Sequence, residues 1–421
     1  MSNRRDFLKM SAAATAAALV VAGGVHAAEN DTIKVGLIGC GGRGTGAAFD
    51  VLRAAPKVEI VALGDAFEDR LKACRRDLAN QAQDERVKQL GNKVSVKDES
   101  CFFGLDAYKK VIDYPEVNYV ILATPPGFRP MHLAYAVAKN KHIFTEKPVA
   151  VDGPGIRTVY DAYESAKKKK LAIVAGTQRR HQASYLELMK RIHGGEIGEL
   201  VGGRCYWNQA ILWQRPRTPN MSDLEYQMRN WYNFTWLCGD HIVEQHVHNI
   251  DVLNWAFQNH PVKAVGMGFR TRTDPRYGHI YDFFATDYEW ENGVHTLSMC
   301  RQISNCANNI SEALVGTKGT ASTLGGMWIN GKRLAGRRGE VSPYIQEHTD
   351  LIASIREKKP LNEARRIAES SLVSIMGREA AYTGQVIKWD ELMKSNLDLS
   401  PPKYEFGPHT PRPVRLPGKT S

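Results

Sequence analysis

The sequence of 421 residues contains no apolar run long enough to cross a membrane. Its weakly apolar stretch from Ser11 to Ala22 covers about a dozen residues, whereas a transmembrane helix needs about 20. A membrane anchor is therefore not expected. The sequence also lacks a cysteine pattern. Its seven cysteines are odd in number, and no two of them form a Cys-x-x-Cys pair. The sequence shows no metal framework, and no metal site is expected.

A concentrated basic surface is missing as well. The formal net charge is +11, but the positive residues are spread along the chain. The densest run, 167–170, follows a helical segment, where cations suit the carboxyl end of the helix dipole. No aromatic residues alternate with it, so a nucleic-acid partner is not expected. The composition is otherwise that of a globular protein, 43% hydrophobic and 24% charged, and the length suits two domains.

The first residues have the pattern of an export signal. Arg4-Arg5 is followed by Phe7-Leu8-Lys9, by the weakly apolar stretch and by Val25-His26-Ala27, a small-residue cleavage pattern. The paired arginines resemble the twin-arginine export signal. We therefore expect residues 1–27 to be a signal peptide, the mature chain to start near Ala28, and the protein to be periplasmic. Because this route carries folded proteins, the cysteines are expected to be buried and reduced.

A glycine-rich loop follows the first strand-like segment, 33–38. It reads Gly39-Cys40-Gly41-Gly42-Arg43-Gly44 and leads into a helix-like segment, 47–52. A second strand-like segment, 58–65, ends at Asp65 about 20 residues on, which completes the dinucleotide-binding fingerprint. The glycines let a pyrophosphate approach the start of the helix, and Asp65 can accept from a ribose hydroxyl. The competing interpretation is a glycine-rich turn without a ligand. The predicted NAD contacts are Gly39, Gly41, Gly42, Arg43, Gly44 and Asp65, and Arg43 keeps NADP as the alternative cofactor.

Two further strand-like segments end in turns that carry polar and proline residues. Segment 117–123 is followed by Thr124-Pro125-Pro126, and segment 142–145 is followed by Glu146-Lys147-Pro148. In an α/β sheet such turns lie beyond the carboxyl ends of the strands, where ligands bind. The polar stretch 80–105, by contrast, is expected to be a connection without chemistry.

With the glycine loop and a His-rich segment, 238–251, Glu146-Lys147-Pro148 resembles the signature of the Gfo/Idh/MocA family of glucose-fructose oxidoreductase, inositol dehydrogenase and rhizopine-catabolism proteins. The resemblance covers nearly the whole chain after residue 31. It implies a Rossmann domain over 31–178, an α+β substrate and oligomerisation domain over 179–400, and a homo-oligomer. It also implies that the cofactor is contacted by Thr124, Pro125, Pro126, His132, Glu146 and Lys147, with Lys147 at the junction of nicotinamide and substrate.

Family members commonly read Asp-x-Gly-x-His-x-x-Asp in the His-rich segment, and the corresponding residues here are Glu244, His246, His248 and Asp251. The resemblance implies that His248 takes the hydroxyl proton and that Lys147 stabilises charge on the same oxygen. At i, i+4 on a helix, Glu244 is expected to hold the His248 imidazole. His246 in place of Gly puts the pocket shape in question. Asn249 and Asp251 are expected to bind neighbouring hydroxyls.

The same histidines allow a second interpretation. His241, Glu244 and His248 share one face of the predicted helix, and with His246 they could ligate a metal. We prefer a core or catalytic cluster, because the chemistry implied by the resemblance needs no metal.

Four tryptophans, Trp207, Trp213, Trp231 and Trp236, alternate with amide side chains. Aromatic faces beside amides suit a pyranose, but tryptophans also fill cores and interfaces. We assign Trp207 to the substrate, and also Arg179, which lies in the predicted crossover 176–181 between the domains.

The second half contains several strand-like segments, 262–269, 280–290, 293–300 and 311–316, which predict an open, mostly antiparallel sheet. The fold class is therefore α/β followed by α+β. The last residues, 401–421, contain six prolines and are expected to be an extended arm or disordered.

Together these features predict an NAD(P)-dependent oxidoreductase that moves hydride between a secondary alcohol of a sugar, polyol or glycoside and a tightly bound nicotinamide cofactor. One alternative is an NAD-dependent glycosidase that oxidises its sugar transiently, although the sequence has no counterpart of a Tyr-Pro-Thr-His stretch associated with such enzymes. Another is a cofactor-binding sensor, which leaves Lys147 and His248 unexplained. Outside the cytoplasm free NAD is scarce, so we expect ping-pong or redox-neutral chemistry, with residues 401–421 as a candidate cover for the cofactor.

Overall fold

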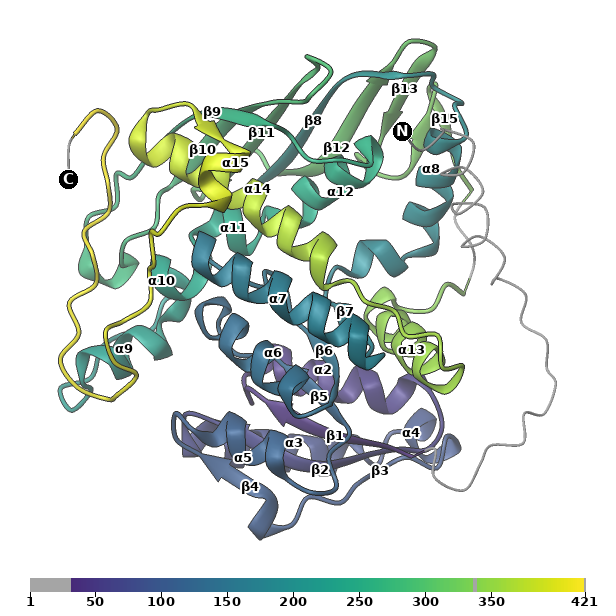
Figure 1. Ribbon diagram of the computed structural model, residues 1–421, viewed down its shortest axis with the longest axis vertical. Coiled ribbons are helices and arrows are strands. Elements are labelled where there is room, and N and C mark those ends of the chain that lie inside the picture. The colour runs from purple at the N-terminus through teal and green to yellow at the C-terminus, as the bar shows by residue number, and fades with distance from the viewer. Residues whose placement is uncertain (1–31, 336–338, 420–421) are drawn as a thin grey trace. The chain divides into compact units, whose positions relative to one another are not determined.

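The structure is a computed structural model that describes residues 32–335 and 339–419 (Figure 1). The expected signal peptide, residues 1–27, lies outside the described residues. From Ile33 onward the chain forms one compact unit, which is built around two sheets. The predicted division at residue 178 into two domains stays a prediction.

The first sheet has seven strands, all parallel, in the order β3-β2-β1-β5-β6-β7, with β4 beside β2. Its central strands are buried runs rich in Val, Ile and Leu, as expected when both faces of a parallel sheet are covered. This is the Rossmann arrangement that the sequence predicted. The strands are β1 Ile33–Ile38, β2 Val58–Asp65, β3 Lys93–Val94, β4 Cys101–Phe103, β5 Tyr119–Leu122, β6 His142–Thr145 and β7 Ile173–Ala175.

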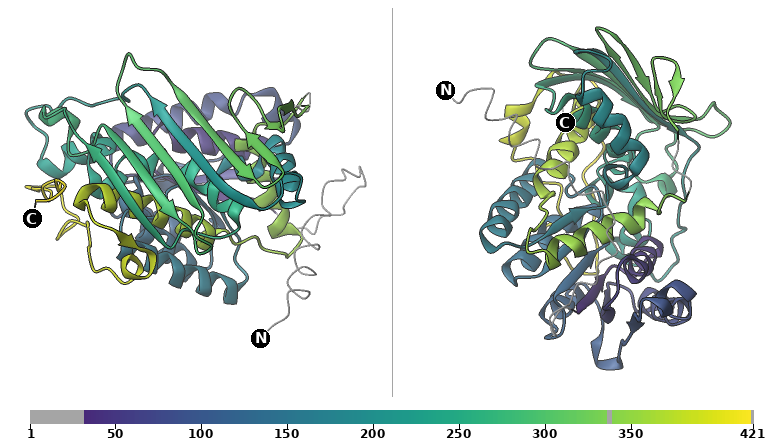
Figure 2. Two further views of the ribbon diagram at one scale, coloured as in Figure 1. Left: turned by 90° about the horizontal axis from the view of Figure 1, so that it is seen from above. Right: turned by 90° about the vertical axis from the view of Figure 1, so that its right-hand side faces the viewer.

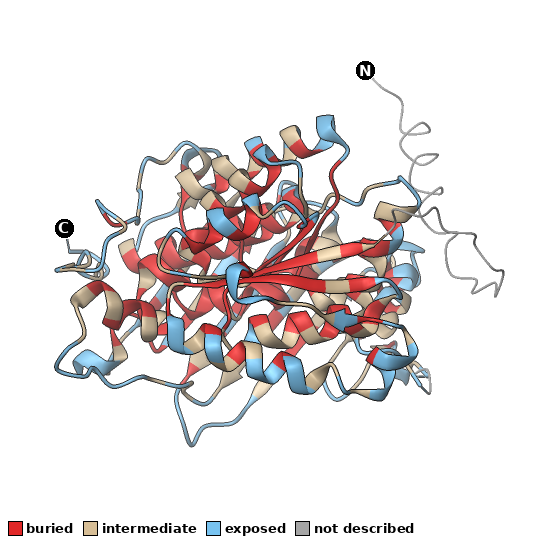
Figure 3. Cartoon of the chain, turned by 90° about the horizontal axis from the view of Figure 1, so that it is seen from below, coloured by how far each residue is buried: buried red, intermediate tan, exposed pale blue. Residues whose placement is uncertain are grey.

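Helices cover both faces of this sheet, and Figure 3 shows the buried strands between helices whose outer faces are exposed. On one face α2 and α3 share a core with α13, which comes from far along the chain and adds Leu351 and Ile352. On the other face the core continues without a break into the second sheet. The helices around the first sheet are α2 Gly42–Ala54, α3 Glu68–Gln81, α4 Glu85–Gln89, α5 Ala107–Asp113, α6 Arg129–Ala138, α7 Gly153–Lys169 and α13 Pro343–Arg356.

The second sheet has nine strands in the order β15-β14-β13-β12-β8-β11-β10-β9-β16. Only β8 and β11 pair in parallel, so the prediction of a mostly antiparallel sheet is confirmed. Helices α12 and α14 pack against one face, and Figure 2 shows the other face open. The strands are β8 Leu200–Gln209, β9 Lys263–Phe269, β10 Phe283–Glu289, β11 His295–Gln302, β12 Asn309–Gly316, β13 Gly319–Ser322, β14 Trp328–Ile329, β15 Lys332–Arg333 and β16 Ile387–Lys388.

The remaining α-helices lie in the second half of the chain or link the two sheets, and five short 3-10 helices are distributed along the part of the chain that the structure describes. They are α8 Ala183–His193, α9 Asp223–Arg229, α10 Thr235–Cys238, α11 His241–Glu244, α12 Val247–Phe257, α14 Ala364–Thr383 and α15 Trp389–Met393, with the short 3-10 helices η2 Asp98–Ser100, η3 Pro126–Phe128, η4 Gln178–His181, η5 Trp231–Asn233 and η6 Pro275–Tyr277.

Several segments differ from the sequence expectation. The central strand β8 was not recognised, because Gly202 and Gly203 interrupt its apolar pattern. Residues 401–419 have no helix or strand, as expected from their prolines, but they pack along the body of the chain past α9 (Figure 1). The seven cysteines are all free, and five are buried. The expectation of buried thiols is wrong for Cys306, which is exposed, and Cys101 is only partly covered.

Candidate active site

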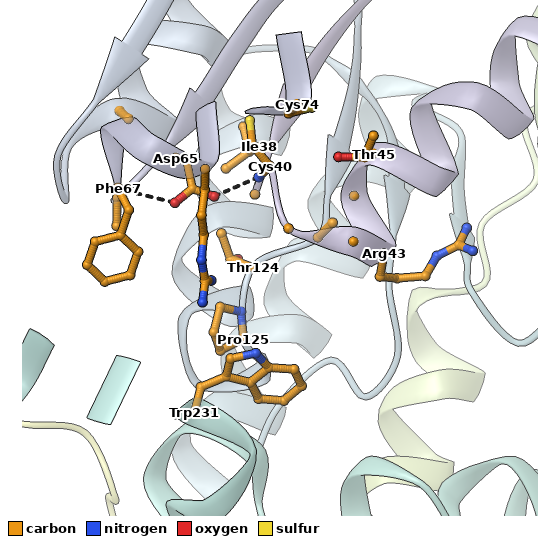
Figure 4. Close-up of a pocket in the computed structure, with 18 of the residues that line it drawn as sticks. Ile38, Cys40, Arg43, Thr45, Asp65, Phe67, Cys74, Thr124, Pro125 and Trp231 are labelled. Atoms are coloured by element: carbon orange, nitrogen blue, oxygen red, sulfur yellow. Dashed lines mark hydrogen bonds between the residues drawn. The ribbon is translucent and has the colours of Figure 1, made fainter. Parts of the chain in front are cut away.

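A cavity of about 750 Å³ opens beyond the carboxyl ends of β1, β2 and β5 (Figure 4). Its size suits a cofactor-sized ligand. Three residues of the expected cofactor set do not line it, namely Pro126, Glu146 and Lys147. The expected residues that do line it are Gly39, Gly41, Gly42, Arg43, Gly44, Asp65, Thr124, Pro125 and His132.

The glycine loop is shaped as a cradle for a phosphate. Gly39 has a φ of +99°, and a Cβ added at Gly44 would lie 1.8 Å from the Gly39 carbonyl oxygen. A Cβ at Gly41 or Gly42 would meet nothing within 4 Å, so these two glycines face open space. Among the described residues no side chain caps the first turn of α2, which leaves its N–H groups for an anion. The loop therefore fits the pyrophosphate of a dinucleotide.

Asp65 ends β2 at the same cavity. Its Oδ2 accepts a hydrogen bond from the Cys40 N–H at 2.7 Å, and its Oδ1 accepts from the Phe67 N–H at 2.9 Å. Burial raises the pKa of this carboxyl, and the two backbone hydrogen bonds oppose the rise. A carboxylate has about four acceptor positions. Asp65 therefore retains capacity for a ribose hydroxyl.

Arg43 points away from Asp65 (Figure 4). Its Nε lies 2.7 Å from Glu146 Oε1, and its Nη2 lies 3.2 Å from Asp50 Oδ2. The side chain thus joins the start of α2 to the turn that carries Lys147. Arg70, not Arg43, is the lining arginine whose charge acts on the Asp65 carboxyl, so Arg43 gives no support to the alternative of NADP.

The turn after β5 is held by a residue that the sequence did not single out. Arg129 is buried and donates hydrogen bonds to the carbonyl oxygens of Thr124 and Pro148. It thereby joins the two turns expected at the cofactor. His132 Nδ1 lies 3.1 Å from Thr124 Oγ1, and its ring stacks 4.1 Å from that of Tyr108. Burial lowers the pKa of His132 to about 3, so this imidazole is neutral.

Lys147 is paired with Glu244. Its Nζ lies 2.8 Å from Glu244 Oε1 and donates to the Glu244 carbonyl oxygen at 2.5 Å. The expectation that Glu244 holds the His248 imidazole is wrong, because the segment is not one continuous helix. α11 ends at Glu244 and α12 begins at Val247, and both oxygens of the Glu244 carboxylate have other partners, Lys147 Nζ at Oε1 and Gln245 Nε2 at Oε2.

His248 is buried beside Trp207, whose ring is stacked 5.7 Å away. Burial lowers its pKa well below the usual value, and the charges of Lys147 and Arg179 lower it further. The imidazole is therefore unprotonated at neutral pH, which is the form that can accept a proton. Its Nδ1 has no hydrogen-bond partner among residues 32–335 and 339–419.

Arg179 lies over Trp207, with its guanidinium 5.6 Å from the ring centre. Its Nη1 donates to Glu312 Oε1 at 2.6 Å and to Asn249 Oδ1 at 2.9 Å. Asn249 Nδ2 donates in turn to the carbonyl oxygens of Tyr206 and Ser311. The Asn249 amide is thus satisfied by the protein and positions Arg179. Its expected contact with substrate stays a prediction, and this geometry does not support it.

Asp251 is engaged in the same way. Its Oδ2 lies 2.7 Å from Arg180 Nε, and its Oδ1 accepts from Arg180 Nη2 at 2.9 Å and from Ser370 Oγ at 2.8 Å. Both oxygens therefore have protein partners. The expected contact with a substrate hydroxyl stays a prediction without support from the contacts.

The other two histidines of the segment belong to the core. His241 packs edge-on against Phe284, and His246 Nε2 lies 2.8 Å from Ser298 Oγ. Burial lowers the pKa of each to about 3. Within the described part of the chain, no group of three His, Cys, Asp or Glu side chains is arranged to hold a metal ion.

The four tryptophans separate into different places. Trp207 lies beside His248, whereas Trp213 and Trp231 line the cofactor cavity. Trp236 is buried and packs edge-on against Phe128. The cavity also contains Gly104 and Leu105, from the stretch expected to carry no chemistry. No sequence signal marked these two residues, because their position depends on β4 pairing with β2.

Two family models match the region that contains these sites. The model described as "Oxidoreductase family, NAD-binding Rossmann fold" matches residues 33–177, and the model described as "GFO/IDH/MocA C-terminal domain" matches residues 185–322. The chain belongs to the GFO/IDH/MocA family. Residues 33–177 accordingly have the NAD-binding Rossmann fold, and the prediction of that fold and of NAD as the cofactor is confirmed. A third model, for the twin-arginine translocation signal, matches residues 1–21 and confirms the export signal.

Named proteins resemble the chain more distantly. Inositol 2-dehydrogenase of Salmonella typhimurium (strain LT2) is 26% identical over 240 residues, which are 56% of this chain and 58% of that protein. A glycosyl hydrolase family 109 protein of Streptomyces niveus is 25% identical over 188 residues, which are 45% of this chain and 35% of that protein. The chain thus spans less than two thirds of the length of these relatives.

The solved structure of scyllo-inositol dehydrogenase from Lactobacillus casei with bound cofactor NAD(H) and scyllo-inositol has the same fold. The TM-score is 0.62 at 16% identity, and the match covers 85% of this chain and 99% of that one. None of the helices that the structure describes is both long and apolar enough to pass through a bilayer.

Proposed function

We propose that this protein oxidises a secondary alcohol of a sugar, polyol or glycoside with NAD as the hydride acceptor. The observation that carries the proposal is the convergence of Lys147, Glu244, His248 and Trp207 beside the NAD-binding domain. The names of the relatives, an inositol dehydrogenase and a glycosyl hydrolase, support a polyhydroxylated substrate.

Each residue has a distinct task in this proposal. When bound, NAD supplies the carbon that receives the hydride. The unprotonated His248 imidazole accepts the proton of the substrate hydroxyl. The Lys147 ammonium donates a hydrogen bond to the same oxygen and stabilises the negative charge that develops there. Glu244 keeps Lys147 oriented through the 2.8 Å ion pair. The Trp207 ring offers an apolar surface to the C–H face of a sugar.

The test is single-turnover reduction of bound NAD on mixing with a panel of sugars, polyols and glycosides. At least one compound should give the absorbance of the reduced nicotinamide. His248→Ala should slow that step by about 10²–10⁴-fold, the usual contribution of a positioned base. His193→Ala is the matched control, because His193 is exposed and its side chain hydrogen-bonds to the Trp255 carbonyl oxygen. Reduction at the wild-type rate in His248→Ala would contradict the assignment.

A second candidate function is NAD-dependent cleavage of a glycoside through transient oxidation, which the similarity to a glycosyl hydrolase family 109 protein favours. The two functions leave different products. The oxidoreductase yields an oxidised sugar and reduced cofactor, whereas cleavage releases a free aglycone and returns NAD to its starting state. Chromogenic glycosides distinguish them, because release of the chromophore without net reduction of NAD supports only the glycosidase.

We propose that the exported protein works in the periplasm with a cofactor that it bound before export. The twin-arginine signal supports this location, since proteins leave by that route already folded. Mature protein denatured after extensive dialysis should then release about one dinucleotide per chain, and its kinetics should be ping-pong or redox-neutral. Apoprotein that turns over only with added NAD would contradict the proposal.

We also propose a homo-oligomer that forms through the open face of the second sheet. On three adjacent strands, the side chains that point away from the helices include an apolar row in register, Met267, Ala285 and Met299, and the rows on either side of it also carry Asp287 and Arg301. Met267 is 69% exposed, and Val265, Phe269, Phe283 and Leu297 are exposed around it. A contiguous apolar face of this kind is typical of an interface, and a second copy offers the same face.

Light scattering on the wild-type protein and on Met267→Glu tests the oligomer. The charge should shift the mass toward that of a monomer, while Leu186→Glu, an exposed apolar position on α8, should leave the mass unchanged. A wild-type protein that is monomeric at every concentration would contradict this proposal and leave the proposed chemistry intact.

A further inference from the structure

The cofactor cavity has a second wall that does not come from the NAD-binding domain. Trp213, Arg215, Met228 and Trp231 line it together with Asp65. We call residues 212–231, which lie between β8 and α10, the roof. Figure 4 shows Trp231 on the side of the cavity that faces Asp65. Because the acidic residue after the second strand marks the adenosine ribose, the roof covers the adenosine half of the cofactor.

The roof is held in shape by a buried asparagine. Asn230 Oδ1 accepts hydrogen bonds from the Arg215 N–H at 2.9 Å and from Asn233 Nδ2 at 2.8 Å. Its own Nδ2 donates to the Arg276 carbonyl oxygen at 3.0 Å. The rings of Trp213 and Trp231 pack edge to face 5.8 Å apart. The aromatic wall is therefore already formed in the protein alone.

One ion pair joins the roof to the NAD-binding domain directly. Arg229 on α9 lies 3.1 Å from the Asp69 carboxylate, and its guanidinium sits 3.9 Å from the centre of the Phe67 ring. The Asp69 side chain is 65% exposed, however, and ion pairs of that kind contribute little in water. Leu224, Tyr226 and Met228 of α9 also share a buried hydrophobic cluster with Phe67 and Phe128, so the roof packs on the NAD-binding domain mainly through apolar contact.

The C-terminal tail, residues 401–419, adds hydrogen bonds on the outside of the roof. Its Gly407 carbonyl oxygen accepts from the Leu224 N–H at 3.2 Å, and its His409 carbonyl oxygen accepts from Gln227 Nε2 at 2.8 Å. The His409 N–H also donates to Asp223 at 3.1 Å. All three partners lie on α9, which belongs to the roof and leads directly to Trp231.

The same tail also packs on the NAD-binding domain. Phe406 stacks on Phe67 with the ring centres 5.8 Å apart, and Tyr404 lies 5.5 Å from Phe128. Phe67 and Phe128 are themselves lining residues of the cofactor cavity. The tail therefore bridges the two walls of the cavity from outside.

We propose that the C-terminal tail is a latch that holds the roof closed over the adenosine half of NAD, so that the protein releases its cofactor slowly. A dinucleotide can leave a covered cavity only if the roof lifts. Lifting α9 away from Phe67 and Phe128 breaks the tail contacts, because the tail is attached to both. This role depends on the NAD site and not on which sugar is oxidised.

Release of NADH from the loaded protein into an excess of NAD, followed by cofactor fluorescence, tests the latch. Phe406→Ala removes one aromatic contact and should speed release about two- to tenfold. Lys403→Ala, an exposed tail residue with no described contact, should release at the wild-type rate. Phe406→Tyr, which keeps the ring, should restore slow release. Equal release rates in Phe406→Ala and the wild type would overturn the proposal.

The roof has its own matched pair of variants. Trp231→Ala should speed release about tenfold or more, because stacking of a base on an aromatic ring contributes on this scale. Trp328→Ala removes a tryptophan of β14, away from the cavity, and should leave the rate unchanged. A Trp231→Ala protein that holds NADH as long as the wild type would overturn the assignment of the roof.

Hydrogen exchange on the wild-type chain gives a test that needs no substitution. Because the latched state is the state that holds NAD, the tail contacts and NAD binding are coupled at equilibrium, and each stabilises the other by the same free energy. Exchange at the Leu224 and His409 amides, which bond to Gly407 and Asp223, should therefore slow when NAD is bound. Identical exchange with and without NAD would overturn the latch. A protein that binds NAD with this protection but oxidises no sugar would refute only the proposed function.

Discussion

The cofactor cavity and the proposed catalytic residues are built in different ways. The glycine loop holds its shape through backbone conformation, with open space in front of Gly41 and Gly42. Asp65, the buried acid at the end of β2 that lines the same cavity, is held by the backbone N–H groups of Cys40 and Phe67. The proposed catalytic residues instead come from distant segments, and their side chains hold one another in place, as Lys147 and Glu244 do.

The difference extends to charge. Behind the catalytic residues lie buried ion pairs, Arg179 with Glu312 at 2.6 Å and Arg180 with Asp251 at 2.7 Å. Removing one partner of such a pair leaves an uncompensated buried charge. Substitutions in the catalytic half should therefore affect both activity and folding, whereas substitutions in the cofactor half should affect mainly ligand affinity.

The largest effect is expected for Lys147→Met, which keeps the length of the side chain and removes its charge. Reduction of bound NAD should slow by about 10³-fold or more, since the developing charge on the substrate oxygen loses its partner. NAD should stay bound, because Lys147 does not line the cavity. Lys168→Met, at an exposed position, is the control. Loss of NAD together with activity would contradict the separation of the two sites.

A further Glu244→Gln substitution sharpens this test. Lys147→Met alone leaves the Glu244 carboxylate buried without its cation, so the protein should also unfold at lower denaturant concentration. The double variant should recover part of that stability without recovering activity.

The next largest effect is on stability and depends on pH. His181 Nδ1 lies 2.6 Å from Asp350 Oδ2, and its Nε2 lies 3.5 Å from Glu363 Oε1. Burial lowers its pKa, but the charge of Glu363 and the hydrogen bond to Asp350 outweigh burial, and the pKa rises to about 9. The folded protein therefore holds a proton that the unfolded chain loses above about pH 6.5.

His181→Gln should accordingly be destabilised by roughly 3 kcal/mol below about pH 6.5, and the difference should vanish as the pH rises through 9. Denaturant unfolding of both proteins across this range measures it. His295→Gln, on the exposed face of β11, serves as the control. A stability difference that does not change with pH would show that the ion pairs of His181 contribute nothing.

The smallest effect is expected in the cofactor half. Asp65→Ser removes a charged acceptor beside the ribose, so NAD should bind about ten- to a hundredfold more weakly. NADP should bind better than to the wild type, because Arg70 then faces a phosphate without a competing carboxylate. Titration with each cofactor measures both changes. The gain for NADP should disappear in Asp65→Ser with Arg70→Ala, and a gain that persists would exclude Arg70 as its cause.

The sequence predicted the cofactor half well because its signals are local. The strand, the glycines of 39–44, the helix and Asp65 follow one another in a single βαβ unit, and the structure brings them to one cavity. The catalytic half was predicted only through resemblance. The one contact that we derived from residue spacing, between Glu244 and His248, was wrong. The derivation assumed one continuous helix, whereas α11 ends at Glu244 and α12 begins at Val247.

Other misses have the same origin. The sequence predicted that Asn249 and Asp251 bind substrate hydroxyls. In the structure Arg179 donates to Asn249 and Arg180 pairs with Asp251, and no sequence pattern indicated these contacts. Arg129 carried no motif, and it joins two turns only because the ends of β5 and β6 lie side by side.

The sequence by itself therefore determined the fold class, the export signal and the NAD site, because backbone geometry and short-range order produce them. Only the tertiary structure decided which charges are paired, which tryptophan lies beside His248, and where the proline-rich tail lies. These outcomes depend on contacts between residues far apart in the chain. A buried charge or ring takes whichever partner the packing brings near, and no pattern along the chain specifies that partner.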